Sequence, residues 1–199
     1  ALSELNLDNI NPTFIESHRL SPFNIRATDV DVVLDLMIHD IDILLNLVKS
    51  DINNIVASGV SVLSNKIDMA NARIEFINGC VANLTASRIS QKQLRKFRVF
   101  ENNKYTNIDF LHPSQETYIL DKHKPNKQSP HVIVSENQDK YIIYSKSKIK
   151  PYNALTLELD NFIDSILNQK KPLVSAYDGL AAIEVAFKVL KQINLNNNK

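Results

Sequence analysis

The sequence is poor in glycine and in cysteine. Its 199 residues include only three glycines, Gly59, Gly79 and Gly179, and these cannot form a G-x-G-x-x-G motif or a P-loop. We therefore expect no nucleotide-phosphate loop in this chain. The single cysteine, Cys80, excludes an intramolecular disulfide framework and fits a reducing compartment, so we expect a cytoplasmic location.

Charge imbalance and long apolar runs are also lacking. The 23 basic and 22 acidic residues give a formal net charge of +1, so no global field favours nucleic acid or an anionic membrane. No apolar run approaches the length of a membrane span, and the first twenty residues lack the order of a signal peptide. We expect neither nucleic acid nor a membrane as a partner. The chain opens on Ala1 rather than Met, as a processed protein or a fragment would.

One long apolar stretch, residues 29–49, contains no glycine or proline and predicts a helix packed between other elements. Asp31, Asp35, His39 and Asp42 fall within an arc of about 80° on this helix, whereas Asp40 points to the opposite side. Charged groups on a buried helix cost several kcal/mol unless they are paired or open onto a cleft. The polar stripe therefore predicts a functional cleft.

The remaining pattern predicts an α+β domain: an open, largely antiparallel, mixed sheet with helices packed on one face. The turn signals Asn78-Gly79 and Asn102-Asn103 separate segments rich in β-branched and aromatic residues. Residues 123–130 are typical of an exposed loop, and residues 1–11 and 194–199 of tails. Strands are predicted at residues 13–20, 55–63, 70–76, 80–87, 96–100, 105–110, 132–135 and 140–145, and further helices at 153–167 and 180–193.

Asp35 and His39 are the strongest chemical candidates. Residues four apart on a helix share a face, so a carboxylate there can orient an imidazole for general acid–base catalysis. A buried polar pair that only fixes helix packing would give the same spacing. A metal site of Asp35, His39 and Asp42 is a weaker alternative, because the chain has no second cluster of His or Cys.

A second group of candidates lies on the predicted strands. On residues 13–20, Glu16 and His18 share one face and Ser17 and Arg19 share the other. Arg19 and Arg88 could hold an anionic or hydroxyl-rich ligand. A solvated strand face with surface ion pairs explains these residues equally well. The basic cluster of Lys92, Arg95, Lys96 and Arg98 predicts a solvated strand edge rather than a nucleic-acid site.

Three blocks of the sequence resemble the Gfo/Idh/MocA family of nicotinamide-dependent oxidoreductases. Residues 14–19 (FIESHR) are similar to the family's first strand after its nucleotide domain. Residues 33–42 (VLDLMIHDID) are similar to its catalytic helix with the D-x-x-x-H spacing, and residues 171–184 (KPLVSAYDGLAAIE) to its C-terminal block. The Gly-Gly pair that many members have before the helix is missing, since residues 26–31 read RATDVD.

The resemblance implies that residues 1–199 are the C-terminal, substrate-binding and oligomerising domain of such an enzyme. The N-terminal Rossmann domain, with the family's catalytic lysine in a Glu-Lys-Pro motif, is absent from this chain. By the same resemblance, His39 exchanges a proton with the substrate hydroxyl and Asp35 assists it. Hydride then passes between a sugar-type carbon and NAD or NADP.

Residues 28–39 are most similar to members that act on nucleotide sugars in lipid A metabolism. For such a substrate, Arg19, Glu16 and Arg88 are the expected ligands, with Asp31 and Asp42 in support. An uncovered apolar face of the sheet predicts a homodimer or tetramer. A non-catalytic assembly or binding module that keeps the fold is the alternative from another class.

Overall fold

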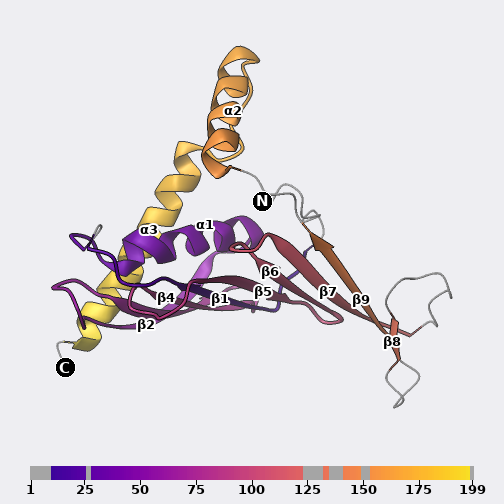
Figure 1. Ribbon diagram of the computed structural model, residues 1–199, viewed down its shortest axis with the longest axis horizontal. Coiled ribbons are helices and arrows are strands. Elements are labelled where there is room, and N and C mark those ends of the chain that lie inside the picture. Colours follow the sequence, from indigo (N-terminus) through magenta and orange to yellow (C-terminus); the bar gives the residue numbers. More distant parts are fainter. Residues whose placement is uncertain (1–9, 26–27, 123–131, 135–140, 149–152, 198–199) are drawn as a thin grey trace.

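In a computed structural model of the chain, described for residues 10–25, 28–122, 132–134, 141–148 and 153–197, one large sheet carries helices on one side (Figure 1). The described part contains nine strands in the order β2-β3-β4-β1-β5-β6-β7-β9-β8. Only the central pair β1 and β4 is parallel among the pairs described there. The predicted α+β class with an open, largely antiparallel sheet is confirmed.

Most predicted elements are present, with shifted ends. Strand β7 was not predicted, and the last helix, predicted at 180–193, extends further at both ends, from Ala176 to Asn197, so that residues 194–197 continue it instead of forming a tail. The elements are β1 Phe14–Leu20, the π-helical turn η2 Val33–Met37, α1 Ile38–Leu47, β2 Ile52–Val60, β3 Met69–Phe76, β4 Val81–Ser87, β5 Leu94–Phe100, β6 Lys104–Asp109, β7 Ser114–Asp121, β8 Val132–Val134, β9 Tyr141–Lys148, α2 Ala154–Leu167 and α3 Ala176–Asn197.

The predicted loop at 123–130 and most of the predicted tail at 1–11 lie outside the described residues. Ile10, at the end of that tail, packs against the core, and the Asn11 N–H donates to the Glu101 carboxylate at 3.0 Å. The chain is therefore already anchored before β1 begins.

The core lies between the sheet and the two helices α1 and α3. On β1, alternate residues point toward these helices, and two of them, Ile15 and Ser17, are buried. Helix α3 packs against α1 and β2, where Ile193 approaches Gly59. A Cβ at Gly59 would come within 2.8 Å of Ile67 Cγ2, so this contact requires glycine.

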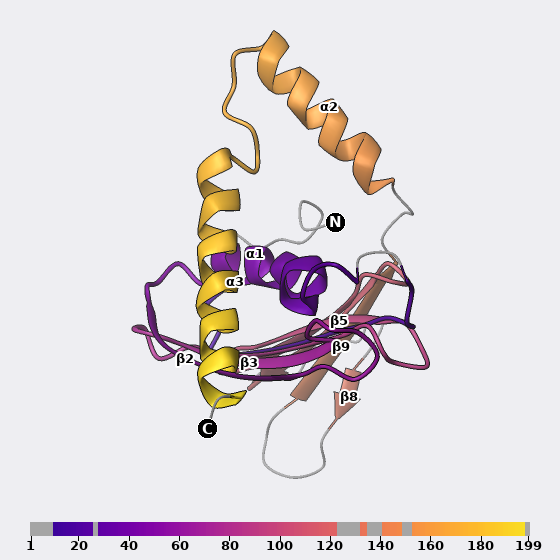
Figure 2. The same cartoon turned by 90° about the vertical axis from the view of Figure 1, so that its left-hand side faces the viewer.

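Helix α2 does not pack on the sheet. It stands away from the sheet above α1 and α3 (Figures 1 and 2). Its cap is regular, since Asn153 Oδ1 accepts hydrogen bonds from the N–H groups of Leu155 and Thr156. Its apolar face is uncovered: Leu155, Phe162 and Leu167 are 62%, 60% and 75% exposed. The expectation that all helices pack on one face is therefore wrong for α2.

Candidate active site at the start of the central helix

A π-helical turn carries Asp35 into the site. The Ile38 N–H donates to the Val33 carbonyl, five residues earlier, and α1 follows directly with His39 in its first turn. Such single π-helical turns occur frequently at functional sites. The predicted uniform helix over 29–49 is corrected at both ends, because the helical part covers residues 33–47.

The His39 side chain is solvent-accessible, although the groups packed around it partly desolvate the imidazole. Burial, together with the nearby Arg19 guanidinium, lowers the pKa of His39, and the carboxylates of Asp40 and Asp35 only partly oppose this. The imidazole is therefore neutral near pH 7 and able to accept a proton. Asp35 acts on His39 through charge; the described contacts include no hydrogen bond between them.

Asp40 and Arg19 form a buried ion pair beside His39. Arg19 Nε and Nη2 donate to the two Asp40 oxygens at 2.9 and 2.8 Å, and the side chains are only 11% and 4% exposed. Asp40 does point away from the polar stripe, as the helical wheel predicted, but it points into the protein toward β1. Asp40 therefore accepts hydrogen bonds from two nitrogens of Arg19, the residue that was expected to bind substrate.

Arg95 lies directly across from Arg19 on the neighbouring strand β5. The two residues are register partners and so share the side of the sheet that faces α1. Arg95 is exposed, and the described residues provide its guanidinium with no hydrogen bond or ion pair. Its positive charge reaches the site, because it contributes, after burial and Arg19, to the lowered pKa of His39.

Glu16 lies on the other side of the sheet. The alternation along β1 directs Glu16 away from α1, and its carboxylate accepts a hydrogen bond from Arg98 Nη1 at 2.8 Å. The sheet therefore lies between Glu16 and the helix side that carries His39, which argues against the predicted role of Glu16 as a ligand of the same substrate.

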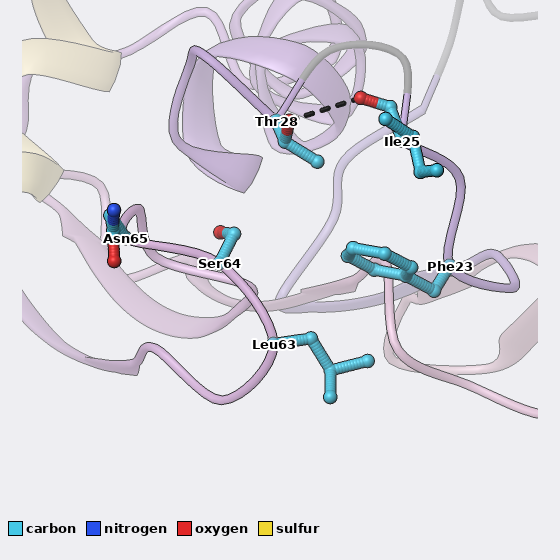
Figure 3. Close-up of a pocket in the computed structure, with 6 residues that line it drawn as sticks. All are labelled: Phe23, Ile25, Thr28, Leu63, Ser64 and Asn65. Atoms are coloured by element: carbon cyan, nitrogen blue, oxygen red, sulfur yellow. Dashed lines mark hydrogen bonds between the residues drawn. The ribbon is translucent and has the colours of Figure 1, made fainter.

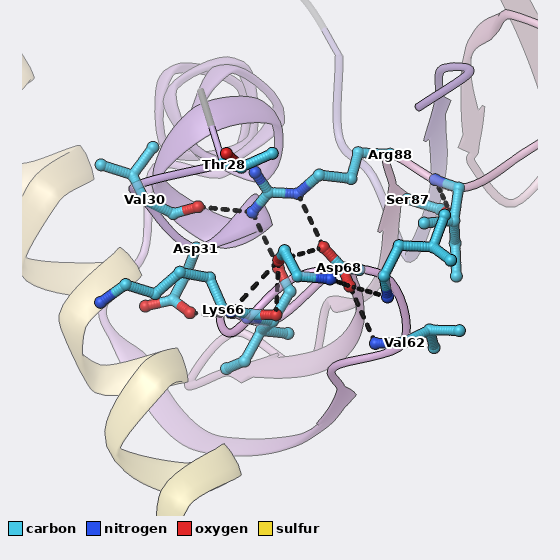
Figure 4. Close-up of polar contacts among 12 residues, drawn as sticks. Thr28, Val30, Asp31, Val62, Lys66, Asp68, Ser87 and Arg88 are labelled. Carbon is cyan, nitrogen blue, oxygen red and sulfur yellow. Dashed lines mark hydrogen bonds and ion pairs between the residues drawn. The ribbon is translucent and has the colours of Figure 1, made fainter. Parts of the chain in front are cut away.

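Arg88 and Asp31 belong to a buried polar hub that holds the start of the central helix (Figure 4). Arg88 Nη2 donates to the carbonyls of Val30 and Ile67, and its Nε lies 3.4 Å from the Asp68 carboxylate. The Asp31 carboxylate accepts from the Ile67 N–H at 2.8 Å. The Arg88 side chain is 4% exposed, so this burial argues against its predicted role as a substrate ligand. Asp31 itself lies just before the helical part, which begins at Val33.

Asp42 lies about one turn beyond His39 on α1. Asn46 Nδ2 donates to its carboxylate at 3.3 Å. Burial, with the negative charge of Asp178 on α3, raises the pKa of Asp42, and the positive form of His39 would lower it. Asp42 therefore links the α1 site electrostatically to the first turn of α3.

Three absences are observed in the described part of the chain. No three His, Cys, Asp or Glu side chains converge there as metal ligands, so the alternative metal site has no supporting geometry. An open hollow near the start of the helix is lined by Phe23, Ile25, Thr28, Leu63, Ser64 and Asn65, without Asp35 or His39 (Figure 3). None of the described helices is long and apolar enough to cross a membrane.

Comparison with known proteins identifies the domain. Residues 13–103, which include β1 to β5 and the Asp35–His39 pair, match the GFO/IDH/MocA C-terminal domain. The chain contains a GFO/IDH/MocA C-terminal domain. The resemblance inferred from the three sequence blocks is thereby confirmed.

The GFO/IDH/MocA relatives are longer than this chain. UDP-N-acetylglucosamine 3-dehydrogenase of Acidithiobacillus ferrooxidans is 32% identical over 178 residues, which are 89% of this chain and 53% of the relative. Two crystal forms of an enzyme of that name from the same organism superpose with TM-scores of 0.79 and 0.81 at 28% and 27% identity. They cover 96% of this chain and 56% and 57% of those chains. The chain thus spans about half the length of the relatives it matches.

A more distant structure shares the fold. Scyllo-inositol dehydrogenase from Lactobacillus casei, solved with bound NAD(H) and scyllo-inositol, gives a TM-score of 0.64 at 17% identity. The match covers 98% of this chain and 58% of that one. The α+β architecture is therefore common to dehydrogenases with different sugar-like substrates.

Sequence reasoning missed Asp40, Asp68 and Arg95. Asp40 gave a signal, because a single carboxylate among apolar residues on the buried side of a helix predicts a buried cation. Asp68 gave none, since three of its partners are backbone N–H groups and Arg88 is 20 residues away in the sequence. Arg95 was grouped with Lys96 and Arg98, although strand alternation alone separates it from them.

Proposed function

We propose that this chain is the substrate-binding half of an NAD(P)-dependent dehydrogenase that oxidises a nucleotide sugar, specifically a UDP-N-acetylglucosamine 3-dehydrogenase. The observation that carries the proposal is the solvent-accessible His39 at the start of the central helix, whose lowered pKa keeps the imidazole neutral, in a chain 32% identical to an enzyme of that name. Asp35 and His39 are the proposed catalytic residues.

The chemistry assigned to the chain is a proton transfer. His39 accepts the proton of the sugar hydroxyl while the C–H bond of the same carbon breaks. The Asp35 carboxylate stabilises the imidazolium that forms, because its charge favours the protonated ring. A bound nicotinamide would take up the hydride. In the reverse direction the imidazolium returns its proton to the carbonyl oxygen.

The chain by itself does not fit a whole dinucleotide. Among the described residues the three glycines lie far apart in the fold: in β2, in the β3–β4 turn and in α3. They form no cradle for a diphosphate. The residues next to His39 would meet only the nicotinamide end of NAD or NADP, and we propose that a preceding Rossmann domain holds the rest. The uncovered apolar face of α2 supports a further domain, which would bury it.

The test is turnover by the full-length protein encoded by the gene. UDP-N-acetylglucosamine should reduce NAD or NADP, and His39→Ala should lower kcat by about 10²-fold to 10⁴-fold. His18→Gln, on the other side of the sheet, is the matched control. Turnover within about twofold of wild type in folded His39→Ala would remove His39 from the mechanism. A gene without a dinucleotide-binding domain would favour the non-catalytic assembly module.

We also propose that a second copy of the chain packs on the sheet side opposite α1, which carries a row of aromatic side chains. Neighbouring rings across five adjacent strands have centroids 4.8 to 5.8 Å apart. The row consists of Phe14, Phe100, Tyr105, Tyr118 and Tyr144. Aromatic residues are enriched at the centres of protein interfaces.

The assembly proposal is tested by the mass of the particle in solution. Wild type should sediment as a dimer or tetramer, and Tyr118→Glu should shift it toward monomer, whereas the exposed Lys188→Glu on α3 should not. A monomeric wild type would refute this surface. A place in lipid A metabolism and a cytoplasmic location complete the proposal, the latter in keeping with the buried free thiol of Cys80.

A further inference from the structure

Two arginines stand opposite each other beside the candidate catalytic histidine, and only one is neutralised. Arg19 on β1 and Arg95 on β5 are direct register partners in an antiparallel pair. Like charges placed opposite each other destabilise a sheet. Asp40 compensates Arg19 through two hydrogen bonds. No carboxylate among the described residues compensates Arg95.

The position of Arg95 places it at the border of the covered core. The next residues of β5 on the same side, Phe97 and Val99, are fully buried. Arg95 precedes them and is exposed, while its backbone carbonyl is held by the Phe110 N–H at 2.9 Å. The backbone is thus fixed and the guanidinium is open to solvent on the side where His39 lies.

The neighbouring basic residues are different. Lys96 Nζ donates to Asp109 at 2.7 Å and Arg98 Nη1 to Glu16 at 2.8 Å, both on the opposite side of the sheet. Within this strand, Arg95 is therefore the cation that faces the site and remains available. Its charge is felt at His39, where it contributes to the lowered pKa after burial and Arg19.

We propose that Arg95 binds the diphosphate of the nucleotide-sugar substrate and so positions the sugar hydroxyl at His39. This inference rests on the proposed function. A guanidinium presents parallel N–H donors that match two phosphate oxygens, and such charge-assisted pairs are about twice as strong as neutral hydrogen bonds. In a nucleotide sugar the diphosphate is joined to the anomeric carbon, on the same ring as the hydroxyl to be oxidised. One residue can therefore hold the anion while another reaches the hydroxyl.

The experiment compares Arg95→Gln, Arg95→Lys and the charge control Lys49→Gln in the full-length enzyme. Arg95→Gln should raise KM for UDP-N-acetylglucosamine about 10-fold to 100-fold, with kcat within about threefold and KM for NAD or NADP unchanged. Arg95→Lys should recover part of the loss, because it keeps the charge but not the fork. Lys49, an exposed residue beyond the far end of α1, should leave all constants unchanged.

The outcomes separate the possible sources of phosphate. An increase in KM confined to the cofactor would overturn the proposal in favour of a cofactor phosphate, and unchanged constants for both would overturn it outright. If wild type oxidised no nucleotide sugar, the proposed function would fail first, and a calorimetric titration with UDP would still decide the role of Arg95. Binding by wild type that is lost in Arg95→Gln would support it. Equal binding, or none by wild type, would refute it.

Discussion

Replacing Asp68 by Asn should strongly destabilise the protein, because Asp68 is the centre of the buried hub before the central helix. One carboxylate oxygen accepts from the N–H groups of Val62, Leu63 and Ser64 at 2.8, 2.7 and 2.9 Å. The other accepts from the Ser64 hydroxyl at 2.6 Å and lies 3.4 Å from Arg88 Nε. The amide of Asn can keep part of this set, but it cannot balance the charge of buried Arg88.

The magnitude follows from the burial and from the pKa. Burial opposes ionisation of Asp68, yet the Ser64 hydroxyl and the three backbone N–H groups outweigh it and lower the pKa from 3.8 to about 2. That shift corresponds to about 2 kcal/mol of folding free energy at neutral pH. Removing one partner of a buried ion pair typically costs about 3–5 kcal/mol, so Asp68→Asn should lose about that much.

The difference in stability between wild type and Asp68→Asn depends on pH, and the lowered pKa of Asp68 sets the direction of that dependence. Because the folded state has the lower pKa, the unfolded chain takes up the proton first as the solution is acidified. The stabilisation is complete above the ordinary pKa of 3.8 and is lost as the pH falls through about 2. The difference in stability between wild type and Asp68→Asn should therefore shrink by about 2 kcal/mol between about pH 5 and pH 2.

Urea unfolding, followed by circular dichroism across this pH range, measures the difference. Asp51→Asn, the same chemical change at an exposed carboxylate, is the control and should stay within about 0.5 kcal/mol of wild type. The reasoning is refuted by an Asp68→Asn variant within about 1 kcal/mol of wild type at neutral pH, or by a difference that does not change with pH.

Three further predictions concern packing, reactivity and the site. Gly59→Ala should lower the free energy of unfolding by about 1–3 kcal/mol, because the new methyl group would meet Ile67 at 2.8 Å; urea unfolding measures this, and an unchanged midpoint would contradict it. Burial raises the pKa of the Cys80 thiol to about 11, so a disulfide reagent should modify it in denaturant but not in the native protein, and rapid native modification would disprove its burial. Asp40→Asn removes a carboxylate that raises the pKa of His39, so the acidic limb of the kcat/KM profile of the full-length enzyme should move to lower pH in variants shown to be folded; a move to higher pH would contradict the assignment.

The sequence predicted the fold well where alternation was strong and less well where partners were distant. β3 and β4 alternate clearly around the Asn78-Gly79 turn, where Gly79 adopts a φ of 86°, and both were predicted. β7 was missed because it begins with the polar run Ser114–Thr117, which becomes a strand only through pairing with β6 and β9.

The candidate site was predicted in part, for a comparable reason. The four-residue spacing of Asp35 and His39 is a local property, and helix geometry was enough to place them together. The Arg19–Asp40 pair spans 21 residues, and no periodicity relates its two members. The π-helical turn was not predicted either, since its sequence, Val33–Met37, contains no glycine or proline that would mark an irregularity.

Strand β1 contributes side chains to both sides of the sheet. Its odd-numbered residues, such as Ser17 and Arg19, face the helix layer, and its even-numbered residues, such as Glu16 and His18, face the open layer. Whether a position in β1 is odd or even therefore decides which side of the sheet a mutation perturbs. Natural variation at even positions can remodel the open layer while the surroundings of His39 stay unchanged, so the two surfaces can diverge independently during evolution.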